Sequence, residues 1–224
     1  MKKILLAMIC CMMGIAAMAQ VPNFGTTCGH GNVYAYQTLK FRPGQNALET
    51  YSTLQVGASD NFMGGFDYYT GPGGSRYFGL VARGGYKFSN YFKLGAQLTP
   101  SFDLNNNFEY SYLTSAIYMN GDITKDGRLF WVTDTWLEND KHELTSAKQW
   151  TYLGYTIPLK GDHSITPMAG VIHDWKFEQD VDLSMGVYYT YKNVNLYAWA
   201  NDLLKDHPRV VLAVEFKFDW FRTK

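Results

Sequence analysis

The chain has 224 residues, with 20 Lys and Arg balanced by 20 Asp and Glu, so its formal net charge is zero. The chain has neither a net positive charge nor a stripe of basic residues, so we exclude nucleic acid as a partner. Aromatic residues make up 17% of the chain, and no apolar run after residue 20 reaches the roughly 20 residues of a membrane-spanning helix. Such a composition is typical of β structure and fits a soluble sandwich or barrel as well as a membrane barrel.

The first twenty residues have the order of a secretory signal peptide. Met1-Lys2-Lys3 is basic, residues 4–17 are apolar, and Ala17-Met18-Ala19 supplies the cleavage pattern. The apolar stretch is short for a membrane helix, and no stop-transfer charges follow it. We therefore expect a signal peptide over 1–19, export, and a short periplasmic segment over 20–32 before the folded domain of residues 33–224.

The cysteines indicate neither a disulfide nor a lipid anchor. Cys10 and Cys11 lie in the signal peptide, and neither follows the small residue that a lipoprotein site needs. Cys28 alone remains after cleavage, so no internal disulfide can form. Cys28 and His30 are too few ligands for a zinc site, and we expect a solvated N-terminal segment without metal. The sequence predicts no cofactor.

Twelve segments of about ten residues alternate in polarity, as β-strands with two different faces do. In chain order, the expected strands are 33–41, 48–58, 62–70, 77–88, 92–102, 108–119, 128–137, 150–159, 165–173, 183–191, 194–200 and 210–221.

The last segment has the clearest pattern. Apolar side chains occupy one face and charged ones much of the other: Val210, Leu212, Val214, Phe216, Phe218 and Trp220 against Glu215, Lys217 and Asp219. Its twelve residues exceed the five or six of a typical soluble strand and suit a tilted membrane strand of about 9 to 11.

The connections alternate in length, as in outer-membrane barrels with short periplasmic turns and longer external loops. Short turns at 89–91, 160–162 and 192–193 follow even-numbered strands, and longer links at 103–107, 138–149, 174–182 and 202–209 follow odd-numbered ones. The link 120–127 is long for its side, and the first two external loops are short. The pattern predicts an all-β, antiparallel, up-and-down transmembrane barrel of about twelve strands, with ten or eight as alternatives.

Aromatic residues gather near the predicted periplasmic ends of several strands. Examples are Phe88, Tyr91 and Phe92 around one turn and Tyr189 and Tyr191 before another, with Phe218, Trp220 and Phe221 at the C-terminus. We interpret them as an aromatic girdle at the membrane interface, with packing in a soluble core as the alternative.

Through its signal peptide, its repeated amphipathic strands and the ending Phe216-Lys217-Phe218-Asp219-Trp220-Phe221, the chain resembles bacterial outer-membrane β-barrels, and the resemblance covers almost all of the mature part. The resemblance implies an outer-membrane location in contact with lipid and, through the final strand, recognition by the barrel-assembly machinery. The chain departs from that class by continuing to Arg222-Thr223-Lys224. Among small barrels, twelve strands around an aromatic-lined interior look most like the nucleoside-channel type.

The polar face of each strand is expected to face the lumen. Asp67, Arg83, Asp134 and Glu215 are expected near mid-height, and Lys217 is expected on the same inner face. A belt of mixed charge can be a constriction that orients a polar solute, as charged rings do in pores, or a set of salt bridges that fills a narrow interior.

Aromatic residues also fall on the predicted inner face. They are Tyr34, Tyr36, Tyr51, Tyr77, Tyr152, Tyr188, Tyr197 and Trp199. Tyr188, Tyr197 and Trp199 belong to hairpin neighbours and are expected to form one patch, which can stack on a planar or sugar-like solute or simply fill space.

Three functions follow from this reading. The preferred one is a narrow, non-enzymatic channel or uptake barrel for small polar solutes. The second is a plugged structural or adhesive barrel that acts through its external loops, chiefly 138–149. The third is an outer-membrane lipid-modifying hydrolase with His173 as its base; it is disfavoured because His173 and Asp174 are adjacent on a strand and point to opposite faces.

Overall fold

A computed structural model describes residues 26–45, 48–176 and 180–219, and almost all of its regular structure is β-strand. The strands are β1 (Asn32–Phe41), β2 (Glu49–Gly57), β3 (Phe62–Thr70), β4 (Arg76–Lys87), β5 (Lys93–Asp103), β6 (Glu109–Asp122), β7 (Leu129–Asn139), β8 (Leu144–Tyr155), β9 (Ile157–Pro158), β10 (His163–Asp174), β11 (Val181–Tyr191), β12 (Val194–Asn201) and β13 (Arg209–Asp219). A single 3-10 turn, Pro72–Gly74, follows β3. None of the helices in these ranges has the length and apolar character needed to cross a membrane.

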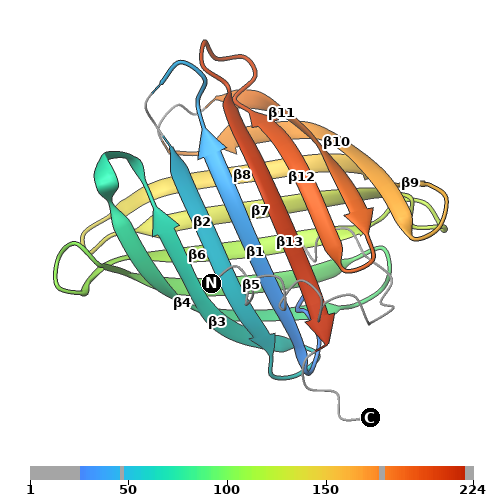
Figure 1. The fold of residues 1–224 in the computed structure, drawn as a ribbon, viewed down its shortest axis with the longest axis horizontal. Helices are drawn as coiled ribbons and strands as arrows, with labels where there is room; N and C mark the ends of the chain where they lie inside the picture. The colour runs from blue at the N-terminus through green and yellow to red at the C-terminus, as the bar shows by residue number, and fades with distance from the viewer. Residues whose placement is uncertain (1–25, 46–47, 177–179, 220–224) are drawn as a thin grey trace, which may run out of the picture.

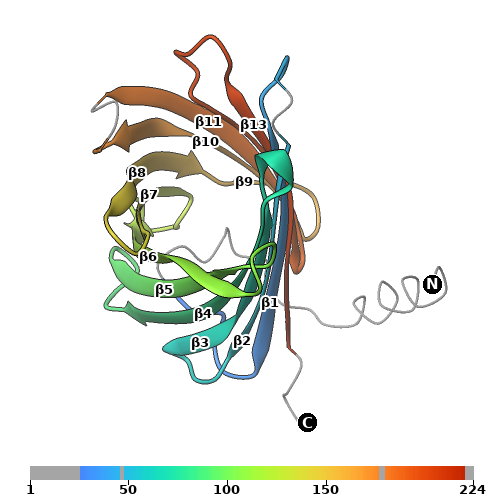
Figure 2. The same ribbon diagram turned by 90° about the vertical axis from the view of Figure 1, so that its left-hand side faces the viewer.

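The strands form one closed antiparallel barrel (Figures 1 and 2). Each strand pairs with the next one in the chain, except that β8 pairs with β10 and not with β9. The β10–β11 and β1–β13 pairings complete the ring. The two-residue strand β9 continues the line of β8 beyond Thr156 and pairs with the start of β10. Because β8 and β9 together occupy one place in the wall, the barrel has twelve strands around its circumference. This confirms the predicted up-and-down topology and strand number.

The barrel has two distinct ends. The first residue of β1, Asn32, pairs with the last described residue of β13, Asp219, so both lie at one end, here called the terminal end. The opposite end, called the distal end, carries the β1–β2 and β12–β13 connections at the top of Figure 1. This arrangement follows from an even number of antiparallel strands.

The predicted long loop over 138–149 is wrong. β7 and β8 run on as a paired ribbon, with Asn139 opposite Leu144, and only residues 140–143 connect them. Asp140 closes this turn by accepting hydrogen bonds from the backbone N–H groups of His142 (2.7 Å) and Glu143 (2.8 Å). Polar composition indicates contact with water but does not exclude a strand, because a ribbon that projects beyond the membrane can be polar on both faces.

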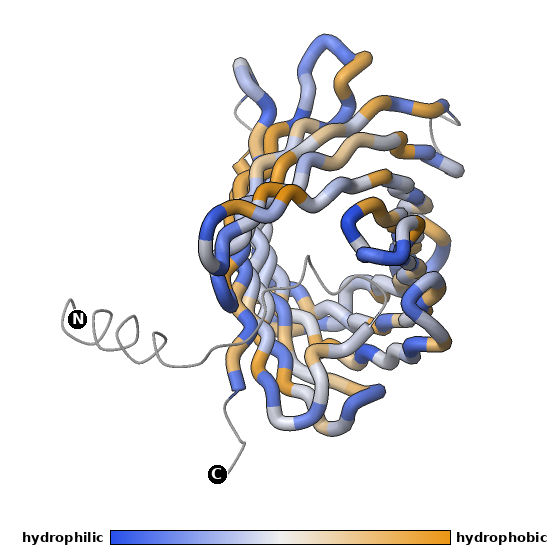
Figure 3. The backbone as a smooth tube through the Cα atoms, turned by 90° about the vertical axis from the view of Figure 1, so that its right-hand side faces the viewer, coloured by the Kyte–Doolittle hydropathy of each residue, from blue (hydrophilic) through white to orange (hydrophobic). Residues whose placement is uncertain are grey.

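The two faces of the barrel wall differ in chemistry, and Figure 3 shows polar and apolar residues alternating along several strands. Large apolar side chains such as Leu80, Leu98 and Leu153 point outward and are about half exposed, at 50%, 53% and 56%. Polar residues such as Thr53, Gln97 and Thr166 are buried on the inner face. This distribution, with apolar residues outside and polar residues inside, is the inverse of that in a soluble protein and is typical of a lipid-facing barrel.

Exposed aromatic residues lie near the terminal end, as the girdle prediction requires. Tyr86, Phe88, Tyr91 and Phe92 are exposed around the β4–β5 connection, and Tyr189 is exposed before the β11–β12 turn. A second outward-facing cluster, Phe78, Phe102, Phe108 and Tyr110, lies near the distal end of β4–β6. Trp220 and Phe221 lie outside the described residues, as does the expected signal peptide.

The described part of the N-terminal segment is packed against the barrel wall, contrary to the solvated segment expected from the sequence. Cys28 is 2% exposed, and its backbone N–H lies 3.3 Å from the Sδ atom of Met63. The Thr27 hydroxyl donates to the Asp60 carbonyl (2.5 Å), and Gly31 N–H donates to the Gly57 carbonyl (2.9 Å). The segment is thus anchored at the terminal end of β2 and β3.

Candidate functional site

The barrel encloses a cavity of about 540 Å³ that is lined by side chains from β1–β8 and β11–β13. Its walls combine tyrosines, tryptophans, charged groups and small polar residues, because these occupy the inward positions of each strand. A cavity of this composition can hold a polar solute of a few hundred Å³. It is the candidate site.

One side of the cavity is an aromatic arc, made of Tyr34, Tyr36, Tyr152, Tyr188, Tyr197 and Trp199. Its members touch in sequence around the wall. Tyr36 stacks on Tyr197 with centroids 6.0 Å apart, and Tyr197 lies 4.6 Å from Tyr188. Tyr188 meets Trp199 edge to face at 5.8 Å, and Trp199 lies 4.6 Å from Tyr152. The arc confirms the expected patch and extends it to β1 and β8.

Charged side chains sit at mid-strand on the inner face, as predicted. Asp67, Arg83, Asp134 and Glu215, here called the waist, all line the cavity, and each is 5% to 7% exposed. The Arg83 guanidinium lies over the Tyr118 ring, 4.0 Å from its centroid. The waist thus combines three carboxyl groups with one guanidinium.

Hydrogen bonds fix two of the waist carboxylates. Glu215 accepts from the Asn195 amide (3.0 Å) and from the Tyr34 hydroxyl (3.3 Å), and the Thr190 hydroxyl donates to Asn195 (2.7 Å). Asp67 Oδ2 accepts from the Tyr51 hydroxyl at 2.5 Å. The partners all lie on the inner faces of neighbouring strands, so the wall itself holds these groups in place.

Nearer the distal end, the cavity wall carries both positive and negative groups. The cavity lining here includes Lys40, Glu49, Glu138, Lys148 and Arg209. Lys40 lies opposite Glu49 in the β1–β2 register, and its Nζ atom is 5.8 Å from the Tyr51 ring centroid. This tier holds three bases and two acids, so the sign of the charge changes along the barrel axis.

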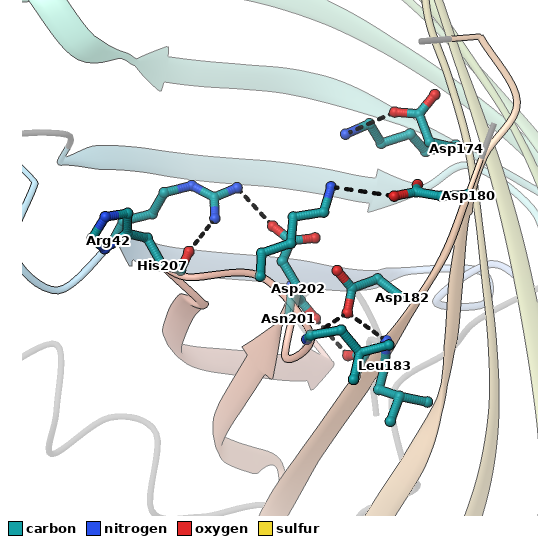
Figure 4. A network of polar contacts seen from close by, with 12 residues as sticks. Arg42, Asp174, Asp180, Asp182, Leu183, Asn201, Asp202 and His207 are labelled. Atoms are coloured by element: carbon teal, nitrogen blue, oxygen red, sulfur yellow. Dashed lines mark hydrogen bonds and ion pairs between the residues drawn. The ribbon is translucent and has the colours of Figure 1, made fainter. Parts of the chain in front are cut away.

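A rim network ties the distal connections together (Figure 4). Arg42 forms an ion pair with Asp202 at 2.6 Å and donates to the His207 carbonyl at 2.5 Å. Lys148 pairs with Asp174 (3.3 Å), and Asp182 Oδ1 accepts from the backbone N–H groups of Leu183 (2.7 Å) and Leu204 (2.9 Å). These contacts position the connections around the mouth of the barrel, and none of them involves a waist residue.

The structure brings together seven of the eight residues singled out from the sequence: Asp67, Arg83, Asp134, Tyr188, Tyr197, Trp199 and Glu215 all line the cavity. Lys217 shares their face but lies two residues beyond Glu215 toward the terminal end, outside the cavity lining. Sequence reasoning missed Asn195 and Tyr118. The alternation along the strands that identified Tyr197 and Asp134 could have found both residues, because each lies at an inward-facing position of its strand.

His173 does not face the cavity. Its neighbours Ile172 and Asp174 are the buried residues at that end of β10, so His173 points to the outer face, where its ring lies 3.9 Å from that of Trp175. The expected opposite orientation of His173 and Asp174 is confirmed. Within the described ranges, no group of three or more His, Cys, Asp or Glu residues could hold a metal ion.

Comparison with known proteins gives the fold. No protein-family model matches the chain, and no curated protein matches it either. A solved structure of the KdgM porin in complex with disordered oligogalacturonate has a TM-score of 0.62 at 13% identity, covering 83% of this chain and 99% of that one. The NanC porin has a TM-score of 0.57 at 11% identity, covering 82% and 100%. The chain therefore has the fold of a small, twelve-stranded bacterial outer-membrane barrel, as predicted.

Proposed function

We propose that the protein is an outer-membrane channel for small polar solutes. The observation that carries the proposal is the cavity itself: polar and aromatic side chains line it, while the outside of the same closed barrel is apolar. A barrel built only for structure has no need of an inner face with open polar surface, because apolar or paired side chains would fill it at lower cost.

The chain reaches its site of action by export. The signal peptide over 1–19 directs it across the inner membrane, and the barrel-assembly machinery inserts residues 33–224 into the outer membrane. The terminal end then faces the periplasm and the distal end faces the outside. The exposed aromatic residues of the β4–β5 connection would lie at the periplasmic interface.

The porin fold of the neighbours favours transport over catalysis. The oligogalacturonate named with one of them makes a saccharide a reasonable solute class for this chain as well. The aromatic arc is compatible with that class, since tyrosine and tryptophan rings can pack against the apolar face of a sugar ring. The outward-facing His173 offers the cavity no base.

Planar-bilayer recording of the purified, refolded protein tests the proposal. We expect discrete conductance steps from protein whose heat-modifiable gel mobility shows a folded barrel. A folded barrel that neither conducts ions nor lets any small sugar enter liposomes would overturn the proposal.

A plugged structural barrel is the second candidate, and one observation favours it. Cys28 and Gly29 pack against Gly57 and Met63, which lie on the inner face of β2 and β3, so the N-terminal segment covers part of the terminal end. Removing residues 20–31 separates the two functions. A channel should conduct with and without the segment, whereas a plugged barrel should conduct only without it.

A further inference from the structure

The waist contains more acid than base. Asp67 on β3, Asp134 on β7 and Glu215 on β13 provide three carboxylates around the cavity, and Arg83 on β4 provides one guanidinium. The basic residues Lys40, Lys148 and Arg209 lie nearer the distal end, beside Glu49 and Glu138. A solute therefore first crosses a mouth of nearly balanced charge and then a waist in which three carboxyl groups face one guanidinium.

Two of these carboxylates have an unused acceptor atom. Asp67 Oδ1 and Asp134 Oδ1 are both buried and have no hydrogen-bond partner among the described residues, although the side chains are 6% and 7% exposed and line the cavity. Leaving a buried carboxylate oxygen without a donor is costly, so such atoms mark places where a ligand or water donates. The side chains of Asp67 and Asp134 line the cavity, where a solute hydroxyl or ammonium group can donate to their carboxyl groups.

The aromatic arc adds to the same preference. Tyrosine and tryptophan rings carry partial negative charge on their faces, which attracts cations and repels anions. The arc extends from β1 through β12 and β11 to β8, so ring faces and carboxylates together surround the passage.

We infer that the waist selects solutes that donate hydrogen bonds and carry no net negative charge, namely neutral polyols and sugars and their amino derivatives, over acidic ones. The inference rests on the proposed channel function and specifies its solute class. Rings of charged side chains set the selectivity of pores in this way. An acidic saccharide would bring its own carboxylates against Asp67, Asp134 and Glu215.

The test has two measurements on the full-length mature protein. The reversal potential in a KCl gradient across a planar bilayer gives the permeability ratio of K⁺ to Cl⁻, which we expect to exceed one. Proteoliposome uptake then compares glucosamine, glucose and glucuronate, which share one ring and differ in charge. Uptake should be slowest for glucuronate.

Variants link the effect to the waist. Asp134→Asn and Glu215→Gln should each lower the K⁺/Cl⁻ ratio roughly fourfold, because one unit charge at about 10 Å in water changes the permeability of each ion about twofold and in opposite directions. Arg83→Gln should raise the ratio. Asp206→Asn is the matched control, because Asp206 is an exposed acid in the β12–β13 connection and should leave the ratio unchanged. The opposite directions of the Arg83 and carboxylate variants distinguish a charge effect from damage to the fold.

The outcomes separate this inference from the function on which it rests. No conductance from a folded barrel contradicts the channel itself. Conductance that prefers Cl⁻, uptake of glucuronate as fast as that of glucose, or a ratio that the waist variants do not move would overturn the inference and leave the channel standing.

Discussion

Tyr188 and Tyr197 face each other directly across the β11–β12 pair, with ring centroids 4.6 Å apart. They form the centre of the aromatic arc, with Trp199 and Tyr36 on either side. If a solute ring packs on this surface, Tyr188→Ala should raise the glucosamine concentration that halves the channel current by roughly twofold to tenfold, since a ring contact contributes about 0.5–1.5 kcal/mol. Tyr189→Leu on the outer face is the control, and equal effects of the two variants would argue against stacking.

Trp199 lies across Gly186, its partner in the β11–β12 register. A Cβ atom at position 186 would fall 2.3 Å from the Trp199 ring, so Gly186→Ala must displace that ring from the arc. We expect a loss of about 1–3 kcal/mol in the free energy of unfolding, as for other overpacked sites. A change in tryptophan fluorescence should accompany this loss.

Gly84→Ala provides the comparison, because a Cβ atom there would meet only the Asn61 carbonyl at 3.7 Å, an ordinary contact. Urea titration in detergent micelles measures both variants. Equal stability of Gly186→Ala and the wild type would mean that Trp199 is not held where the structure places it.

Asn195 connects Thr190 to Glu215 by two hydrogen bonds inside the wall. Asn195→Ala removes a donor from the buried Glu215 carboxylate and an acceptor from the Thr190 hydroxyl. Leaving such groups unsatisfied costs about 1–3 kcal/mol, so the folded gel band should disappear at a lower temperature than for the wild type. Asn61→Ala, at an exposed position, should have no such effect; a wild-type melting profile for Asn195→Ala would show that water replaces the amide.

Asp140 stabilises the β7–β8 turn through its hydrogen bonds from Glu143 and His142, and these bonds lower the pKa of its carboxyl group below the usual value of 3.8. Because the pKa is lowered in the folded state, the charged carboxylate stabilises the turn fully above pH 3.8. This stabilisation is lost as the pH falls through the lower pKa of the folded state. Asp140→Ala should therefore increase proteolysis in residues 138–146 at neutral pH, and much less so near pH 3. Lys141→Ala should leave the cleavage rate unchanged at both pH values.

The inward or outward direction of each side chain could be predicted from the sequence, because alternation along a strand is a local property of the backbone. The strands and the inward positions of Asp67, Asp134 and Glu215 follow from that period of two, and the antiparallel order follows from the alternating lengths of the connections. The extent of β7 and β8 could not be predicted in this way. Their polar ends have no apolar face, and only the backbone pairing of Asn139 with Leu144 makes them strands.

The sequence by itself determined which residues face the lumen, whereas the tertiary structure decided which of them meet. Tyr36 and Tyr197 are far apart in the chain, and their rings stack only because β1 closes the barrel against β13, with β12 on its other side. The waist depends likewise on the register of each strand pair. Alternation does not fix this register, because a shift by two or four residues keeps every side chain on the same face. Closure of the ring fixes these registers together and so assembles the aromatic arc and the three carboxylates around one cavity.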